Sequence, residues 1–222
     1  MKNPLLLAVF VLGAFLLFAF YLVSTILYKQ RHKQAYHFYS MFPYEFNYPS
    51  VFKENTYGNV LFILGSLAIT TSYILNPYDS IYKTMGMILA IIFTMVLICL
   101  VLMPMQFLRT HLTLAVVTMV LAMALPLFNF FLALQQYRLE VEQSKQALDI
   151  ISMVISGLLS LTMMALILNP KLTFKIYMEK DIDENGNELF RRPKVIPLAL
   201  NEWMSVFVFF LSPLAVVLIS LI

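Results

Sequence analysis

The chain has 222 residues, of which 61% are hydrophobic and only 12% are charged, and its formal net charge is +3 at pH 7. Globular domains carry roughly 25% charged and 45–50% apolar residues, and a domain of this size has too little interior to hide so much apolar surface. The composition therefore excludes a water-soluble enzyme, a disordered tail and a nucleic-acid binder. It is typical of a protein that lies in a lipid bilayer.

Six runs of the sequence contain no charged residue, and each is 20 residues or longer. A helix needs about 20 apolar residues to cross the hydrocarbon core of a membrane. We therefore predict an all-α membrane protein, a six-helix transmembrane bundle that forms a single integral membrane domain over residues 1–222. The predicted spans are Leu5–Tyr28, Tyr57–Leu75, Met85–Met105, Leu112–Leu134, Ile150–Leu168 and Met204–Ile222.

The first span lies where a cleavable signal peptide would lie. Its apolar stretch is 24 residues long, whereas the apolar region of a signal peptide has about 7–15, and no small-residue cleavage motif follows. Lys29, Arg31 and Lys33 follow this span, and only Lys2 precedes it. We expect the span to be retained as an anchor with its N-terminus outside.

The first loop, residues 35–56, is rich in aromatic side chains. Its prolines disfavour a regular helix, so we expect an extended segment. Aromatic rings suit the membrane boundary, and the favoured interpretation is an interfacial anchor along the inner leaflet. The alternative is the lip of a pocket for a lipid, an isoprenoid or another flat apolar ligand, with Tyr44, Glu45 and Phe46 in contact with it. The aromatic residues from the start of this loop to the start of the second span are Tyr36, Phe38, Tyr39, Phe42, Tyr44, Phe46, Tyr48, Phe52 and Tyr57.

All three histidines, His32, His37 and His111, fall on the same predicted side of the membrane as Glu45 and Arg109. A separation of five residues does not place His32 and His37 on one helical face, so we expect no metal site, and we expect no cofactor. Arg109 and His111 have the charge and the donors to hold a lipid phosphate. The alternative, which we favour, is that Arg109 and His111 lie at a solvated end of a loop and bind no ligand.

Small residues recur at helical spacing in two spans. Ser152, Ser156 and Ser160 are four residues apart, a pattern that lets two membrane helices approach closely. Gly58 and Gly65 are seven residues apart in the second span. These seams fit packing among the six helices of one chain better than a surface for self-association.

Pro126 and Pro213 lie inside the fourth and sixth predicted spans. A proline removes a backbone donor, so we expect a kink in each helix. Kinked or broken helices form substrate sites in transporters. Unwound helix segments usually need glycines, and the chain has only 6, so we favour two bends without a substrate site.

The fifth loop, residues 169–200, is predicted to contain a short cytoplasmic β-hairpin between the fifth and sixth helices. Two alternating segments flank Asn185-Gly186, a dipeptide typical of two-residue hairpin turns. That turn would place Ile182 opposite Leu189 and Asp183 opposite Glu188. The segment also resembles half of a calcium-binding loop, but its twelfth position is Arg192 where a glutamate is required. A hairpin is marginal alone, so we expect it to dock a partner through Asp183, Asn185, Gly186, Arg191 and Arg192.

The basic residues predict the orientation of the protein, because Lys and Arg accumulate in cytoplasmic loops. Eleven of the 15 lie in the first, third and fifth loops. We therefore expect a bacterial cytoplasmic (plasma) membrane protein with these loops inside and both termini outside. The eleven are Lys29, Arg31, Lys33, Lys53, Arg109, Lys171, Lys175, Lys180, Arg191, Arg192 and Lys194.

The predicted spans hold no charged residue, although proton pumps, ion-coupled carriers and intramembrane enzymes keep ionisable groups at mid-depth. We therefore expect a non-catalytic subunit or scaffold of a membrane complex that serves transport, envelope assembly or defence. Its expected partners are membrane lipids, further copies of the chain, or a cytoplasmic or membrane protein. The alternative is a small carrier or flippase-like binder of a lipid or other apolar solute. An enzyme is a distant third, and no catalytic residue is predicted.

Overall fold

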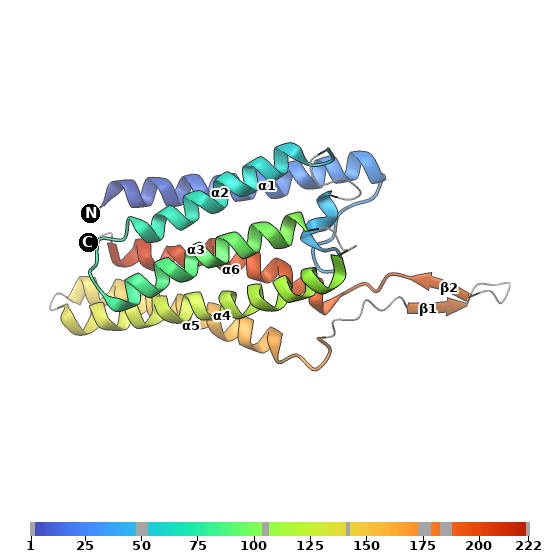
Figure 1. The fold of residues 1–222 in the computed structure, drawn as a ribbon. Helices are drawn as coiled ribbons and strands as arrows, with labels where there is room; N and C mark the ends of the chain where they lie inside the picture. The colour runs from blue at the N-terminus through green and yellow to red at the C-terminus, as the bar shows by residue number, and fades with distance from the viewer. Residues whose placement is uncertain are drawn as a thin grey trace.

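Six apolar helices dominate the protein, as the sequence predicts (Figure 1). A computed structural model describes residues 3–47, 53–103, 107–140, 143–172, 179–182 and 188–220. Within these residues all six long helices are apolar enough to cross a membrane, so the chain is compatible with a multi-pass membrane protein. The helices are α1 (Pro4–His32), α2 (Thr56–Ile74), α3 (Ile81–Leu102), α4 (Leu108–Leu139), α5 (Gln143–Ile167) and α6 (Pro197–Ser220).

The ends of the helices follow local capping chemistry. Asn3 precedes α1 and its side chain accepts a hydrogen bond from the backbone N–H of Leu6, while Pro4 takes the first helical position, where no donor is needed. Lys33 ends α1 in the left-handed conformation, with φ of 54°. Helix α6 begins at Pro197, seven residues before the predicted span. This earlier start brings Glu202 into the helix.

Helix α6 lies at the centre of the bundle and contacts all five other helices. In its most apolar stretch 67% of the residues are buried, against 28% in α1 and 22% in α5, which lie at the outside. Consecutive helices run antiparallel, so both termini lie at one end of the bundle (Figure 1). The α1–α2, α3–α4 and α5–α6 connections lie together at the opposite end, which we call the loop end.

Helices α1 and α2 approach closely where Gly58 and Gly65 face α1. A Cβ atom on Gly65 would lie 2.9 Å from Cγ of Leu17. At Gly58 it would overlap the Ser24 hydroxyl and the side chain of Asn55, with Nδ2 of Asn55 at 2.6 Å. Ser24 and Asn55 are buried and hydrogen-bonded to each other, with Nδ2 of Asn55 donating to Oγ of Ser24 at 2.9 Å. The glycine therefore makes room for a buried polar contact between α1 and Asn55, the residue that precedes α2.

Replacing Gly58 by alanine should destabilise the bundle. The added methyl group must displace Ser24 or Asn55, and overpacking together with a broken buried hydrogen bond should lower the free energy of unfolding by about 2–4 kcal/mol. Equilibrium unfolding in mixed micelles measures this. Gly86→Ala in α3 is the matched control, because its Cβ would meet Asn129 Oδ1 at an ordinary 3.8 Å. A Gly58→Ala protein as stable as Gly86→Ala would contradict the assignment.

The serines of α5 attach this helix to its two neighbours. Oγ of Ser152 donates to the carbonyl of Ala215 in α6 at 3.1 Å, and Oγ of Ser160 donates to the carbonyl of Met123 in α4 at 3.0 Å. Ser156 is buried between them. All three serines are thus placed for packing inside the bundle.

Both interior prolines lie within helices that continue past them, α4 at Pro126 and α6 at Pro213. A proline weakens the helical bonds to the carbonyls three and four residues before it. The carbonyl of Met123, three residues before Pro126, is the one that Ser160 binds. Near Pro213, Nδ2 of Asn129 donates to the carbonyl of Ser212 at 2.9 Å. A neighbouring side chain thus compensates for the effect of Pro126, whereas the bond near Pro213 ties α4 to α6.

The fifth loop contains two short strands, β1 (Glu179–Ile182) and β2 (Glu188–Arg191), which pair antiparallel and extend beyond the helices (Figure 1). The register differs by one residue from the prediction. Ile182 lies opposite Glu188, not Leu189, so the connection is longer than a two-residue turn. Asp183, Asn185 and Gly186 lie outside the described residues.

Candidate functional site

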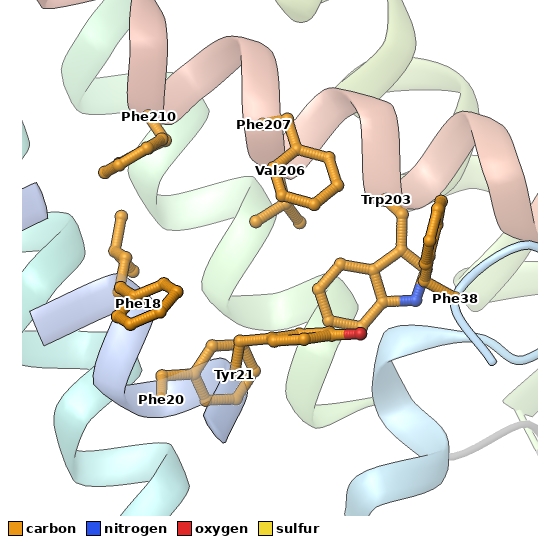
Figure 2. Close-up of a pocket in the computed structure, with 9 residues that line it drawn as sticks. Phe18, Phe20, Tyr21, Phe38, Trp203, Val206, Phe207 and Phe210 are labelled. Carbon is orange, nitrogen blue, oxygen red and sulfur yellow. The ribbon is translucent and has the colours of Figure 1, made fainter. Parts of the chain in front are cut away.

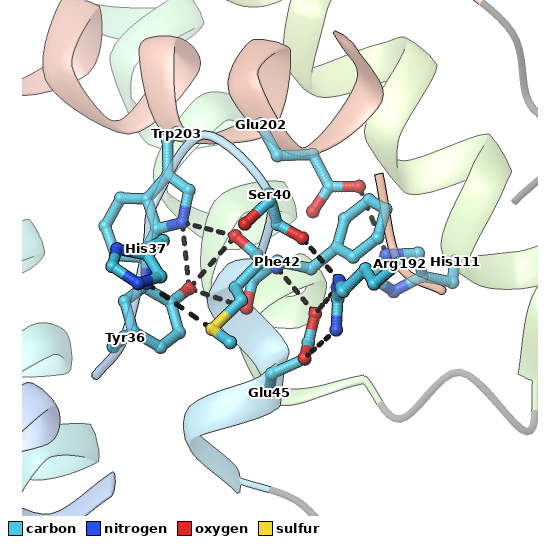
Figure 3. A network of polar contacts seen from close by, with 10 residues as sticks. Tyr36, His37, Ser40, Phe42, Glu45, His111, Arg192, Glu202 and Trp203 are labelled. Carbon is cyan, nitrogen blue, oxygen red and sulfur yellow. Dashed lines mark hydrogen bonds and ion pairs between the residues drawn. The ribbon is translucent and has the colours of Figure 1, made fainter. Parts of the chain in front are cut away.

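The loop end holds a network of polar contacts that joins the first loop, α4, the segment after β2, and α6 (Figure 3). We call this set of residues the end network. It draws together residues that are far apart in the sequence, and it contains three of the ionisable residues singled out above, Glu45, His111 and Arg192. Its members are Tyr36, Ser40, Glu45, His111, Arg192, Glu202 and Trp203.

The part of the first loop before residue 48 folds back onto the bundle. Residues Pro43–Asn47 form a 3-10 helix, η1, which a proline can begin because its first position needs no donor. Oε1 of Glu45 accepts a hydrogen bond of 2.8 Å from the backbone N–H of Phe42. Phe42 and Phe46 are fully buried within the protein. The prediction of an extended segment is therefore wrong for residues 43–47, and Phe42 and Phe46 pack against other side chains of the protein.

Trp203 of α6 holds the folded first loop in place. Its Nε1 donates to the hydroxyl of Tyr36 at 2.9 Å and to the carbonyl of Met41 at 3.0 Å. The Tyr36 hydroxyl lies 2.8 Å from the carbonyl of Phe42, to which it can donate. Phe46 packs edge-on against Trp203, with ring centroids 5.8 Å apart. Burial raises the pKa of Tyr36 well above its usual range, and the charge of Glu45 adds to this, so the phenol stays a donor.

Arg192 joins the root of the β-strands to the first loop. Its two terminal nitrogens bind both carboxylate oxygens of Glu45, one of them at 2.9 Å. Its Nε donates to the carbonyl of Ser40 at 2.7 Å. Burial lowers the pKa of Arg192, but the bonds and charge of Glu45 raise it by more, so the guanidinium stays charged. The sequence assigned Arg192 to partner docking and Glu45 to ligand contact, whereas the structure pairs the two residues with each other.

His111 and Glu202 form a pair that the sequence analysis missed. Nε2 of His111 lies 3.2 Å from Oε1 of Glu202, and the two side chains are 0% and 1% exposed. Nδ1 of His111 lies 3.3 Å from the carbonyl oxygen of Met103, so each ring nitrogen has an oxygen atom within hydrogen-bond distance. The ring of Tyr44 covers His111 edge-on, with centroids 4.8 Å apart. Oε2 of Glu202 is buried without a hydrogen-bond partner among the described residues.

The structure separates Arg109 from His111. Residues two apart in a helix project from nearly opposite sides, so His111 points into the bundle while Arg109 is exposed. The idea that both hold one phosphate is therefore wrong. His32 and His37 are exposed, away from buried His111, and no three His, Cys, Asp or Glu residues gather in the described part of the chain.

A cavity of about 290 Å³ lies between α1 and α6 (Figure 2). Phe38 of the first loop lines it beside Trp203. The sequence did not indicate it, because its walls come from two helices that are distant in the chain. Its lining residues are Leu17, Phe18, Phe20, Tyr21, Phe38, Trp203, Val206, Phe207 and Phe210.

The arrangement of the end network is that of a structural lock. Arg192, Glu45, Tyr36 and Trp203 make their hydrogen bonds to one another or to nearby backbone groups. Comparison with known proteins adds no functional assignment: no family model matches the chain, and no curated protein and no solved structure matches it significantly.

Proposed function

We propose that the chain is a non-catalytic subunit of a membrane complex that docks a protein partner at its loop end. The observation that carries the proposal is the pair of strands β1 and β2, which extends away from the helices (Figure 1). A two-stranded hairpin is only marginally stable in water. Each strand of such a pair has a free edge, and free edges accept a strand from another protein. A partner that binds here would stabilise the pair.

The end of the strand pair that lies next to the bundle, which we call its root, is held by hydrogen bonds. A strand pair that docks a partner, which we call the docking arm, needs such an attachment. Arg192 follows β2 directly and is held by Glu45 and by the carbonyl of Ser40. The backbone N–H of Ile196 donates to the carbonyl of Tyr39 at 2.9 Å. These contacts orient the arm relative to the membrane, so that a partner bound to it would be positioned over the loop end.

The loop end faces the cytoplasm of a bacterial cell in this proposal, because eleven of the 15 basic residues lie in its three connections or in the helix turns next to them. Alkaline phosphatase fused after Ile222 should be active only if that terminus is outside, and we expect activity. The same reporter inserted after Gly186 is the matched control, and we expect it to be inactive. The reverse pattern would invert the topology.

A photo-crosslinking residue at Leu189 in β2 should give a discrete protein adduct in intact cells, because the docked partner covers this strand. Phe15 of α1 is the matched position, since its side chain is 65% exposed on an outer membrane helix and should contact lipid. Replacing Arg192 by glutamine should weaken the Leu189 adduct by freeing the root of the arm. If Leu189 gives no protein adduct, the docking role fails, while an adduct with the chain itself would make the partner a second copy.

The alternative, a carrier of an apolar solute, gains little support. Its basis in the sequence was the pair of prolines, Pro126 and Pro213. Both lie inside continuous helices, and neither lines the cavity between α1 and α6. We therefore favour the docking role.

A further inference from the structure

The cavity between α1 and α6 is almost entirely apolar, and it opens at the rim of the bundle. Leu17, Phe20, Trp203 and Val206 are buried at its floor, whereas Phe18 at its edge is 59% exposed. Figure 2 shows the rings of α1 facing those of α6 across the hollow. An empty apolar hollow forfeits dispersion contacts along its whole lining. In a bilayer, the apolar matter that surrounds an outer helix such as α1 is lipid hydrocarbon.

Positive charge lies where the headgroup of such a lipid would lie. Lys29 is the first charged residue after the apolar stretch of α1, and it follows Phe18 by 11 residues. Eleven residues are three helical turns, so Lys29 lies on the same face of α1 as Phe18, about 16 Å further along. This separation is of the order of the half-thickness of the hydrocarbon core, about 15 Å. Lys29 and Lys33 are both exposed.

The neighbouring acids do not cancel this charge. Glu45 is bound by Arg192, and Glu54 pairs with Arg31 at 3.0 Å. The last turn of α1 is thus a basic rim at the end of an apolar groove. Such a rim attracts an anionic headgroup more than a zwitterionic one.

We propose that the groove between α1 and α6 is a binding site for an anionic phospholipid. One acyl chain occupies the cavity against Trp203 and Val206, and the phosphate lies at Lys29 and Lys33. The bound lipid fills the gap between α1 and α6, next to Phe38 of the folded first loop. The site is distinct from the proposed docking arm and does not depend on it.

Trp203 provides the probe, because it is the single tryptophan of the chain and lines the groove. The full chain is reconstituted in vesicles of unlabelled phosphatidylcholine that contain a small fraction of lipid with brominated acyl chains, which quench tryptophan on contact. Brominated phosphatidylglycerol should quench Trp203 at a mole fraction about fivefold lower than brominated phosphatidylcholine does. Equal quenching by the two lipids would overturn the proposal.

Variants separate the groove from the general lipid annulus. Lys29→Gln with Lys33→Gln should abolish the preference for phosphatidylglycerol, whereas Lys171→Gln, an exposed residue of the same loop end, should keep it. Val206→Phe should fill the groove and reduce quenching by both lipids. The lysine variants lie on the surface, so they decide the matter even if Val206→Phe does not fold. A preference that survives loss of both lysines would refute the site.

Discussion

Glu202→Ala should lower the free energy of unfolding by about 3–5 kcal/mol, because it leaves His111 buried without its partner. Both side chains are at most 1% exposed, so water cannot replace the lost carboxylate. The remaining imidazole would face the Met103 carbonyl on one side and apolar surroundings on the other. Equilibrium unfolding of the full chain in mixed micelles measures the effect.

Two controls make this prediction specific. Glu54→Ala breaks the Arg31–Glu54 pair, whose side chains are 24% and 22% exposed, and should cost about 1 kcal/mol or less. Replacing both members of the buried pair, with His111→Leu and Glu202→Met, should recover most of the lost stability, since an apolar pair of similar volume needs no partner. If the double variant is as unstable as Glu202→Ala, the loss arises from packing and not from an unpaired polar group.

The position of the buried pair explains what it does for the fold. His111 lies in the first turn of α4 and Glu202 in the second turn of α6, so the contact joins these helices at the loop end. Tyr44 of η1 covers the imidazole. The pair therefore connects α4 to α6 and provides a buried surface on which Tyr44 of η1 packs. A hydrocarbon-facing position would not tolerate either residue.

The apolar runs predicted the six helices because a membrane-spanning helix makes all its backbone hydrogen bonds within itself. Its position can therefore be predicted from the composition of that segment alone. The same logic placed the loops at alternating ends. The composition of single segments does not predict which side chains from distant segments will be in contact. Glu202 was overlooked because the predicted sixth span started at Met204, although Pro197 is a helix-start signal seven residues earlier.

The first loop shows a second limit of the sequence. Its prolines indicated an extended segment, and a high density of rings indicated a membrane surface. Both inferences treat the loop alone. Phe46 of this loop packs against Phe20 of α1 and Trp203 of α6, side chains that are far away in the chain. Only the fold brings these partners together, and the α1–α6 cavity was missed for the same reason.

Trp203→Ala should lower the free energy of unfolding by about 3–5 kcal/mol and should also release the first loop. Trp203 is 1% exposed, and its Nε1 holds Tyr36 and the Met41 carbonyl. Trp203→Phe keeps a ring but loses both hydrogen bonds, so we expect a smaller loss of about 1–3 kcal/mol.

Hydrogen exchange distinguishes the release of the loop from general destabilisation. In Trp203→Ala the backbone amides of residues 36–47 should exchange faster than the helices do, because the loop loses the side chain against which it folds. Phe93→Ala removes a fully buried ring of α3 that packs on Phe209. It should cost a similar free energy while leaving the first loop protected relative to the bundle. If both variants expose residues 36–47 equally, Trp203 is an ordinary core residue and the first loop does not depend on it.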